Sequence, residues 1–171
     1  MREFTRVPNA GEIIDLSGES FRFSDRARMP GRIVLSECDS QAAMEAFIAA
    51  RDSLPSHLHG FVKAHTVEHY LTKRARLFLT EDTRGGFAII GEELASLFSL
   101  PGAHYGDHLV AAAIDRGVCR LSCFDSKGKL LALYGRHGFR ETLRAAFDDS
   151  LAPKDWDYAA WGRPDYVEMS R

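Results

Sequence analysis

The sequence predicts an α/β fold built on a mixed, mostly antiparallel sheet. In the middle of the chain, three short apolar runs at 75–80, 86–90 and 93–99 are separated by compact turns, a pattern typical of an antiparallel meander. After the meander the hydrophobic period becomes helical at 107–116 and again at 129–136. A strand pattern lies between these two helices, and this alternation favours an α/β arrangement. The length of 171 residues suits one domain, so we expect a single domain over 1–171.

The boundaries of the elements follow from capping residues. Residues 1–30 form an irregular N-terminal extension that includes a short hairpin around Ser17-Gly18. Ser40 and Thr66 are N-cap residues of two helices, and Gly138 suits the left-handed position after a helix end. The expected elements are, in order, hairpin strands at 12–16 and 20–23, a strand at 32–38, helices at 42–51 and 66–73, the meander, a helix at 107–116 ended by Gly117, a strand at 118–124, a helix at 129–136, and strands at 139–147 and 166–169.

Composition narrows the classes of function. Hydrophobic residues make up 45% of the chain and charged residues 27%, which is ordinary for a globular protein. A net charge of −2 argues against a nucleic-acid partner. No apolar run reaches the length of a membrane span, and the N-terminus lacks a secretory pattern, so we expect a cytoplasmic protein. Three cysteines do not make a disulfide framework, and Cys119 and Cys123 are interpreted as buried thiols on a strand.

The stretch from Leu133 to Phe139 carries the most chemical information. Leu130, Leu131 and Tyr134 share one helical face, and Gly138 then ends the helix. Tyr134 would therefore lie in the last turn, beside strand ends, where a phenol suits a general acid. The alternative is that Tyr134 is a core aromatic residue and Gly138 an ordinary cap.

A second motif is the strand, loop and helix from Leu94 to Arg116. The first amides of such a helix lack partners within the helix and, with the positive end of the helix dipole, make an anion site. Gly106 lets an anion approach the backbone closely.

These features together resemble the GCN5-related N-acetyltransferase superfamily. Leu133-Tyr134 with Gly138-Phe139 is similar to the family's L-Y-x-x-x-G-F signature. Leu109-Val110 and Ala113 are spaced as in the helix that holds the acyl-CoA pyrophosphate, and the resemblance runs from about Ala75 to Phe147. It implies helices on both faces of the sheet and a splayed central strand pair. The short phosphate loop also resembles compact phage or prophage members.

The phosphate loop departs from the family pattern Q/R-x-x-G-x-G/A. Gly106 takes the second small position, but His104 occupies the first and Pro101 replaces the Gln or Arg. His104 and His108 could compensate as phosphate donors, or the loop has lost its cofactor.

The resemblance implies an N-acyltransferase that moves an acyl group from acetyl-CoA, or another acyl-CoA, to a primary amine of a small molecule or macromolecule. Tyr134 matches the position of the family's acid, while Glu93 and His104 are candidates for the base. The residues expected to contact the cofactor are Phe98, Ser99, Ala103, Tyr105, Gly106, Asp107, His108 and Asp125. For Asp125 the alternative is a cap of the following turn.

Two other functions stay open on the sequence. One is a catalytically inactive binding protein with this fold, favoured by the altered loop. The other is a nucleotide- or nucleic-acid-modifying enzyme, which would need a basic groove. A homodimer is compatible with the sequence, and the acceptor is not specified by it.

Two further patterns have structural interpretations. His65 and His69 have the H-x-x-E-H spacing of a zinc site, but no third ligand follows, so no metal is expected. The aromatic segment 156–161 could line an acceptor pocket, although covering the sheet edge is the favoured interpretation.

Overall fold

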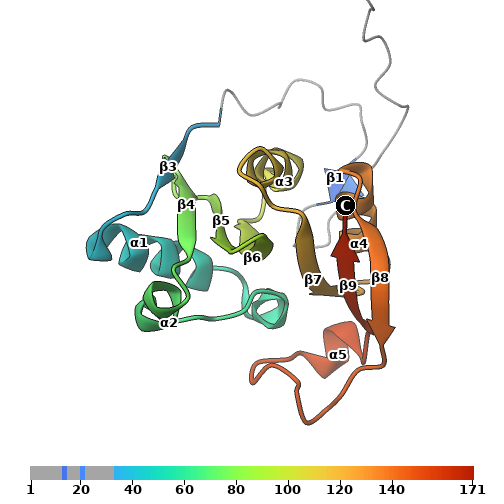
Figure 1. Cartoon of the computed structure of the whole chain (residues 1–171). Coiled ribbons are helices and arrows are strands. Elements are labelled where there is room, and N and C mark those ends of the chain that lie inside the picture. Colours follow the sequence, from blue (N-terminus) through green and yellow to red (C-terminus); the bar gives the residue numbers. More distant parts are fainter. Residues whose placement is uncertain (1–12, 15–19, 22–32) are drawn as a thin grey trace, which may run out of the picture.

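A computed structural model describes residues 13–14, 20–21 and 33–171. Its main feature is a seven-stranded sheet of order β3-β4-β5-β6-β7-β9-β8 (Figure 1). The strands are β3 (Leu35–Glu37), β4 (Arg76–Thr80), β5 (Gly85–Ile90), β6 (Glu93–Ser99), β7 (Arg120–Phe124), β8 (Arg140–Ala145) and β9 (Tyr166–Ser170). The helices are α1 (Gln41–Asp52), the 3-10 helix η2 (Ser56–Phe61), α2 (Val67–Thr72), α3 (Gly106–Ile114), α4 (Lys129–Arg136) and α5 (Tyr158–Trp161).

Helix ends follow the predicted capping chemistry. The Ser40 hydroxyl accepts the Ala43 amide at the start of α1, and the Thr66 hydroxyl does the same for His69 in α2. Gly117 and Gly138 have φ angles of +96° and +87° after α3 and α4. The predicted positions of these four caps are therefore confirmed.

The end of α4 explains the L-Y-x-x-x-G-F motif physically. The Gly138 amide donates to the Gly135 carbonyl at 3.1 Å, and the Phe139 amide donates to the Tyr134 carbonyl at 3.2 Å. This pair of bonds is the Schellman motif, which needs a left-handed residue at the glycine position. The Tyr134 and Phe139 rings pack edge to face at 6.1 Å, which supplies the hydrophobic contact that accompanies the motif.

Alternating strand residues build a core on each face of the sheet. In β5, Phe87 and Ile89 belong to the cluster that includes α3 and α4, while Ala88 belongs to the cluster under α1 and α2. Because side chains alternate along a strand, one short sequence serves both cores. Helices therefore cover both faces, as the resemblance implies (Figure 1).

The central strands β6 and β7 form the one parallel pair of the described sheet, and they separate after two residues. Glu93 pairs with Arg120 and Leu94 with Leu121, but no later residue of β6 pairs with β7. Two residues of β6, Ser96 and Leu97, then face the single residue Phe87 of β5 in a bulge, with Ser96 at φ +51°. The predicted splayed pair is thus confirmed.

Some predicted boundaries were wrong. Of the strand expected at 32–38, the described residues 33–38 form β3 only over Leu35–Glu37, and the strand expected at 139–147 forms β8 over Arg140–Ala145. Gly85 begins β5 rather than ending the turn, and the aromatic segment contains the short helix α5. Cys119 is only partly buried, with its sulfur 3.6 Å from the Glu92 carboxylate, because it precedes β7. Cys123 is buried as predicted.

Two small observations complete the fold. The two-residue strands Ile13–Ile14 (β1) and Ser20–Phe21 (β2) pair antiparallel, as expected for the hairpin, and its turn and the remainder of the extension lie outside the described residues. Within the described ranges, no helix is long and apolar enough to cross a bilayer.

Candidate active site

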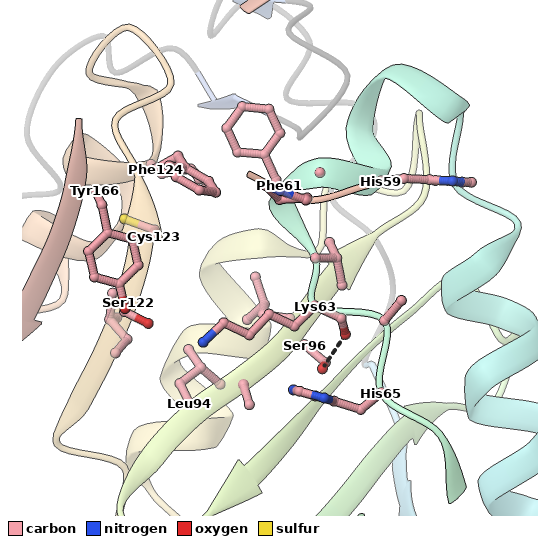
Figure 2. A pocket seen from close by; sticks show the side chains of 18 of the residues that line it. His59, Phe61, Lys63, His65, Leu94, Ser96, Ser122, Cys123, Phe124 and Tyr166 are labelled. Atoms are coloured by element: carbon pink, nitrogen blue, oxygen red, sulfur yellow. Dashed lines mark hydrogen bonds between the residues drawn. The ribbon is translucent and has the colours of Figure 1, made fainter. Parts of the chain in front are cut away.

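A cavity of about 1100 Å³ occupies the space opened between β6 and β7. Its walls come from both strands, from the segment 59–65 that follows η2, from α4, and from the segment 145–155 after β8. Figure 2 shows side chains from the β6, β7 and 59–65 walls turned toward one another. The separation of two neighbouring strands therefore creates this candidate site.

Tyr134 lines this cavity from α4 and is 6% exposed. Burial, together with the nearby Cys123 thiol, raises the pKa of the Tyr134 phenol well above its ordinary value. Burial likewise raises the pKa of Cys123 to about 12. Both groups are therefore protonated near neutral pH, which is the state that a proton donor requires.

Glu93 lines the same cavity from the start of β6, where the two strands are still paired. It is partly buried, and the Ser122 hydroxyl of β7 lies 3.5 Å from its Oε1. Glu93 and Tyr134, two of the three residues predicted to be catalytic, thus lie on one cavity. The third, His104, lies in the loop before α3 with φ +57° and is not part of this lining.

The loop that leads into α3 is held by side chains of its own. The Ser99 hydroxyl accepts the Tyr105 amide at 3.1 Å, and the Tyr105 phenol donates to Asp82 at 2.6 Å. Ala103 is buried beside them, whereas His108 is exposed. The loop is thus anchored to β6 and to the turn between β4 and β5.

Asp107 lies in the first turn of α3, near the predicted anion site. Its carboxylate pairs with Arg136 at 3.0 Å and with His137 at 2.9 Å, both at the end of α4. Burial acts to raise the pKa of Asp107, but these hydrogen bonds outweigh it and hold the pKa below its usual value. The negative charge is therefore compensated within the protein.

The side chains of two residues predicted to contact the cofactor have structural roles. Phe98 is fully buried and packs edge to face on Phe47 at 5.4 Å. Asp125 accepts the Gly128 amide at 2.7 Å and pairs with Arg144 at 3.0 Å. The capping alternative for Asp125 is therefore present in the structure.

The structure adds three residues that no sequence motif indicated as part of this site: Lys63, Ser96 and His65. The sequence pattern suggests His65 only as a metal ligand. Nearby, His59 is partly buried, and its ring bonds the Leu54 carbonyl at 2.6 Å. The sequence feature that could have indicated this wall of the site is the clustering of histidine and lysine between η2 and α2.

His65 and His69 share a face but are not arranged as metal ligands. Their rings stack in parallel with centroids 3.9 Å apart and an angle of 4° between planes. Ring nitrogens donate in the ring plane, so parallel rings do not converge on one ion. The described residues contain no group of three potential ligands.

His65 should make stability depend on pH. Burial, with His69 and the nearby cations as smaller causes, lowers its pKa to about 4. The unfolded chain therefore binds a proton that the folded protein does not between about pH 6.5 and 4. We expect folding stability to fall as pH decreases through this window, by on the order of 1 kcal/mol after discounting for partial exposure.

Urea unfolding of the wild type and His65→Gln at pH 7, 5.5 and 4.5 measures this effect. The variant should lose less stability than the wild type across the window, while the exposed control His108→Gln should follow the wild type. Equal pH dependence in the wild type and His65→Gln would contradict the expectation.

The aromatic segment 156–161, which follows β8, packs against residues that line the cavity. Trp156 is 7% exposed and packs against Phe61 and Phe124, with centroids 5.1 and 4.8 Å away. The Trp161 indole donates to the His57 carbonyl at 2.7 Å. The segment therefore supports η2 and the end of β7, and neither tryptophan is among the lining residues.

No family model matches the sequence, and no curated protein matches it. Solved structures do match. An acetyltransferase from Bacillus subtilis in complex with CoA aligns with TM-score 0.56 and 15% identity over 81% of this chain and 97% of that chain. The spermidine N-acetyltransferase of Vibrio cholerae, in complex with CoA and spermine, aligns with TM-score 0.56 and 15% identity over 79% and 93% of the two chains.

A ribosomal-protein-alanine N-acetyltransferase from Brucella melitensis aligns with TM-score 0.53 and 17% identity over 81% of this chain and 98% of that chain. These matches span nearly the whole of the other proteins, at identities that establish architecture. The likeness extends over about four fifths of this chain, a span that includes most of the seven-stranded sheet. The chain therefore has the GCN5-related N-acetyltransferase fold.

Proposed function

We propose that this protein is an acyl-CoA-dependent N-acyltransferase that acts on a primary amine. The observation that carries the proposal is the cavity between β6 and β7, which Tyr134 and Glu93 both line. The complexes of two similar structures with CoA support the choice of donor.

The β6 edge suits an extended donor. From Ala95 to Ser99 the strand has no β7 partner, so its backbone groups on that side are available to a ligand. An extended chain with its own amides can pair with such an edge as an added strand. The pantetheine arm of CoA has this chemistry.

The start of α3 suits the pyrophosphate of CoA. The amides of Gly106, Asp107 and His108 are the first of the helix and point out of its end. A Cβ at Gly106 would lie in ordinary van der Waals contact with Leu133, at 3.5 Å, so packing does not require glycine at this position. Pro101 offers no amide, but the pairing of Asp107 with Arg136 limits repulsion of a phosphate.

The chemistry then assigns a role to each residue. The acceptor nitrogen forms a C–N bond to the thioester carbon while the C–S bond breaks. Glu93 receives the proton of the amine, directly or through water, and backbone amides of β6 stabilise the developing oxyanion. Tyr134 donates its proton to the departing thiolate.

Calorimetric titration with acetyl-CoA, followed by an assay of thiol release with a panel of amines, tests this function. We expect saturable binding in the micromolar to millimolar range typical of enzyme substrates. Gly106→Glu should abolish binding because it adds an uncompensated carboxylate at the phosphate position. Ala111→Glu, at an exposed position later in the same helix, is the matched control.

Absence of binding at millimolar acetyl-CoA would contradict the donor assignment. Binding without thiol release for any amine would instead support the alternative of a protein that binds CoA without catalysis.

A further inference from the structure

Lys63 directs a positive charge into the cavity. Figure 2 shows its side chain extending from the 59–65 wall into the space beside β6, toward Ser122 and Cys123 of β7. Its side chain forms no ion pair with any residue of the described part of the chain. Because no described carboxylate lies within ion-pair distance of it, the Lys63 ammonium is a candidate partner for an anionic group of a ligand.

A buried hydrogen-bond network holds this segment against the bulge of β6. The Ser96 hydroxyl donates to the Lys63 carbonyl at 3.1 Å and accepts from the Tyr70 phenol at 2.8 Å. Arg51, which is 4% exposed, donates to the Tyr70 oxygen at 3.1 Å and to the His65 carbonyl at 2.9 Å. The backbone of Lys63 is thereby positioned by groups that are themselves fixed in the core.

The rest of the cavity is complementary to a zwitterion with an apolar side chain. Glu93 brings a carboxylate at the paired end of the strands, where the proposed mechanism needs a base. The rings of Phe124 and Tyr166 line the wall on the β7 side, and Phe61 of the 59–65 wall packs edge to face on Phe124 at 6.4 Å. The segment after β8 adds Asp148, Lys154 and Asp155 to the lining, so the cavity combines both signs of charge with aromatic surface.

We propose that Lys63 binds the carboxylate of the acceptor, and that the acceptor is an α-amino acid with an apolar side chain. This inference rests on the proposed acyltransferase function. At Lys63 itself a carboxylate is attracted and an ammonium is repelled, so a zwitterion can place its carboxylate at Lys63 and its amine near Glu93. Lys63 is a positioning and specificity residue here and takes no part in proton transfer.

Competing acceptors test the inference. With acetyl-CoA as donor, we expect kcat/KM for L-phenylalanine to exceed that for L-phenylalaninamide by about 10- to 100-fold, the range of a charge-assisted hydrogen bond. Lys63→Gln should remove most of this preference and leave acetyl-CoA affinity unchanged. Lys73→Gln, on an exposed lysine after α2 that does not line the cavity, should behave as the wild type.

A binding measurement separates this inference from the donor assignment. L-phenylalanine is titrated calorimetrically into the protein with and without saturating CoA, and Lys63→Gln should weaken its binding by a similar factor. Failure to bind acetyl-CoA would reject the acyltransferase function, while loss of L-phenylalanine binding in Lys63→Gln would still support the carboxylate site.

Two results would overturn the assignment. One is equal use and equal binding of the acid and the amide in the wild type. The other is that Lys63→Gln lowers turnover of succinyl-CoA relative to acetyl-CoA without altering the choice of acceptor, which would show that the site serves a carboxylate of the acyl chain.

Discussion

Replacement of Tyr134 by phenylalanine should lower kcat for acyl transfer by about 100-fold, the lower end of the range for general acid catalysis. The substitution removes the phenolic hydroxyl that would protonate the thiolate and leaves the aromatic ring in place. Because the ring keeps its contact with Phe139, the end of α4 should be preserved. Affinity for CoA should therefore change little, and steady-state kinetics with calorimetry measures both quantities.

The pH profile adds a second readout for Tyr134. Its pKa is raised by burial, so the phenol stays protonated throughout the neutral and mildly alkaline range. We expect the rate of the wild type to show no alkaline decline from this group below about pH 10, the ordinary pKa of tyrosine. A thiolate released without a proton donor depends on water instead, so Tyr134→Phe should be slow at every pH.

Tyr166→Phe is the matched control, because Tyr166 also lines the cavity but from β9. It should retain most of the wild-type kcat. If Tyr134→Phe instead keeps its kcat and loses affinity for CoA, Tyr134 is a structural residue of the cavity wall.

Replacement of Phe98 by alanine should reduce the free energy of unfolding by about 3–5 kcal/mol, as large-to-small changes of buried phenylalanines do. The side chain is fully buried and packs on Phe47, and a side-chain atom at Gly86 would lie 3.1 Å from its ring. Such close packing leaves little freedom for the surroundings to fill the void. Urea or thermal unfolding measures the loss.

This experiment also tests whether Phe98 contacts CoA through its side chain. The structure puts the ring in the core, so the folded fraction of Phe98→Ala should bind acetyl-CoA as the wild type does. Leu151→Ala, at a side chain that is 78% exposed, should change stability by less than about 0.5 kcal/mol. A loss of CoA affinity without a loss of stability would show that the ring faces the ligand.

Local chemistry explains why many elements were predictable. Ser40 and Thr66 identify helix starts because their hydroxyls accept amides three residues later, within the same few residues of chain. Gly138 identifies a helix end because the Schellman motif needs a left-handed residue there. The family signature around Tyr134 includes this cap, so it reports the fold more directly than the chemistry.

Boundaries that depend on pairing with distant strands were less predictable. The run from Arg32 to Cys38 has strand composition, yet among its described residues 33–38 only Leu35–Glu37 form a ladder with β4, the one neighbour of β3 at the sheet edge. Cys119 belongs to an alternating pattern, but the ladder of β7 begins one residue later. Strand propensity describes a side chain and not the position of its partner.

For the candidate site, the sequence by itself determined the local scaffold: the cap that ends α4 beside Tyr134, the glycine that opens α3, and the meander that contains Glu93. Tertiary structure alone decided that Lys63, Ser96 and His65 share a cavity with them, and that Phe98 faces the core. The physical reason is the distance along the chain between the residues that each bond joins. Capping bonds join residues three to five apart, whereas the bond from Ser96 to the Lys63 carbonyl joins segments 33 residues apart and exists only after β6 has bulged and separated from β7.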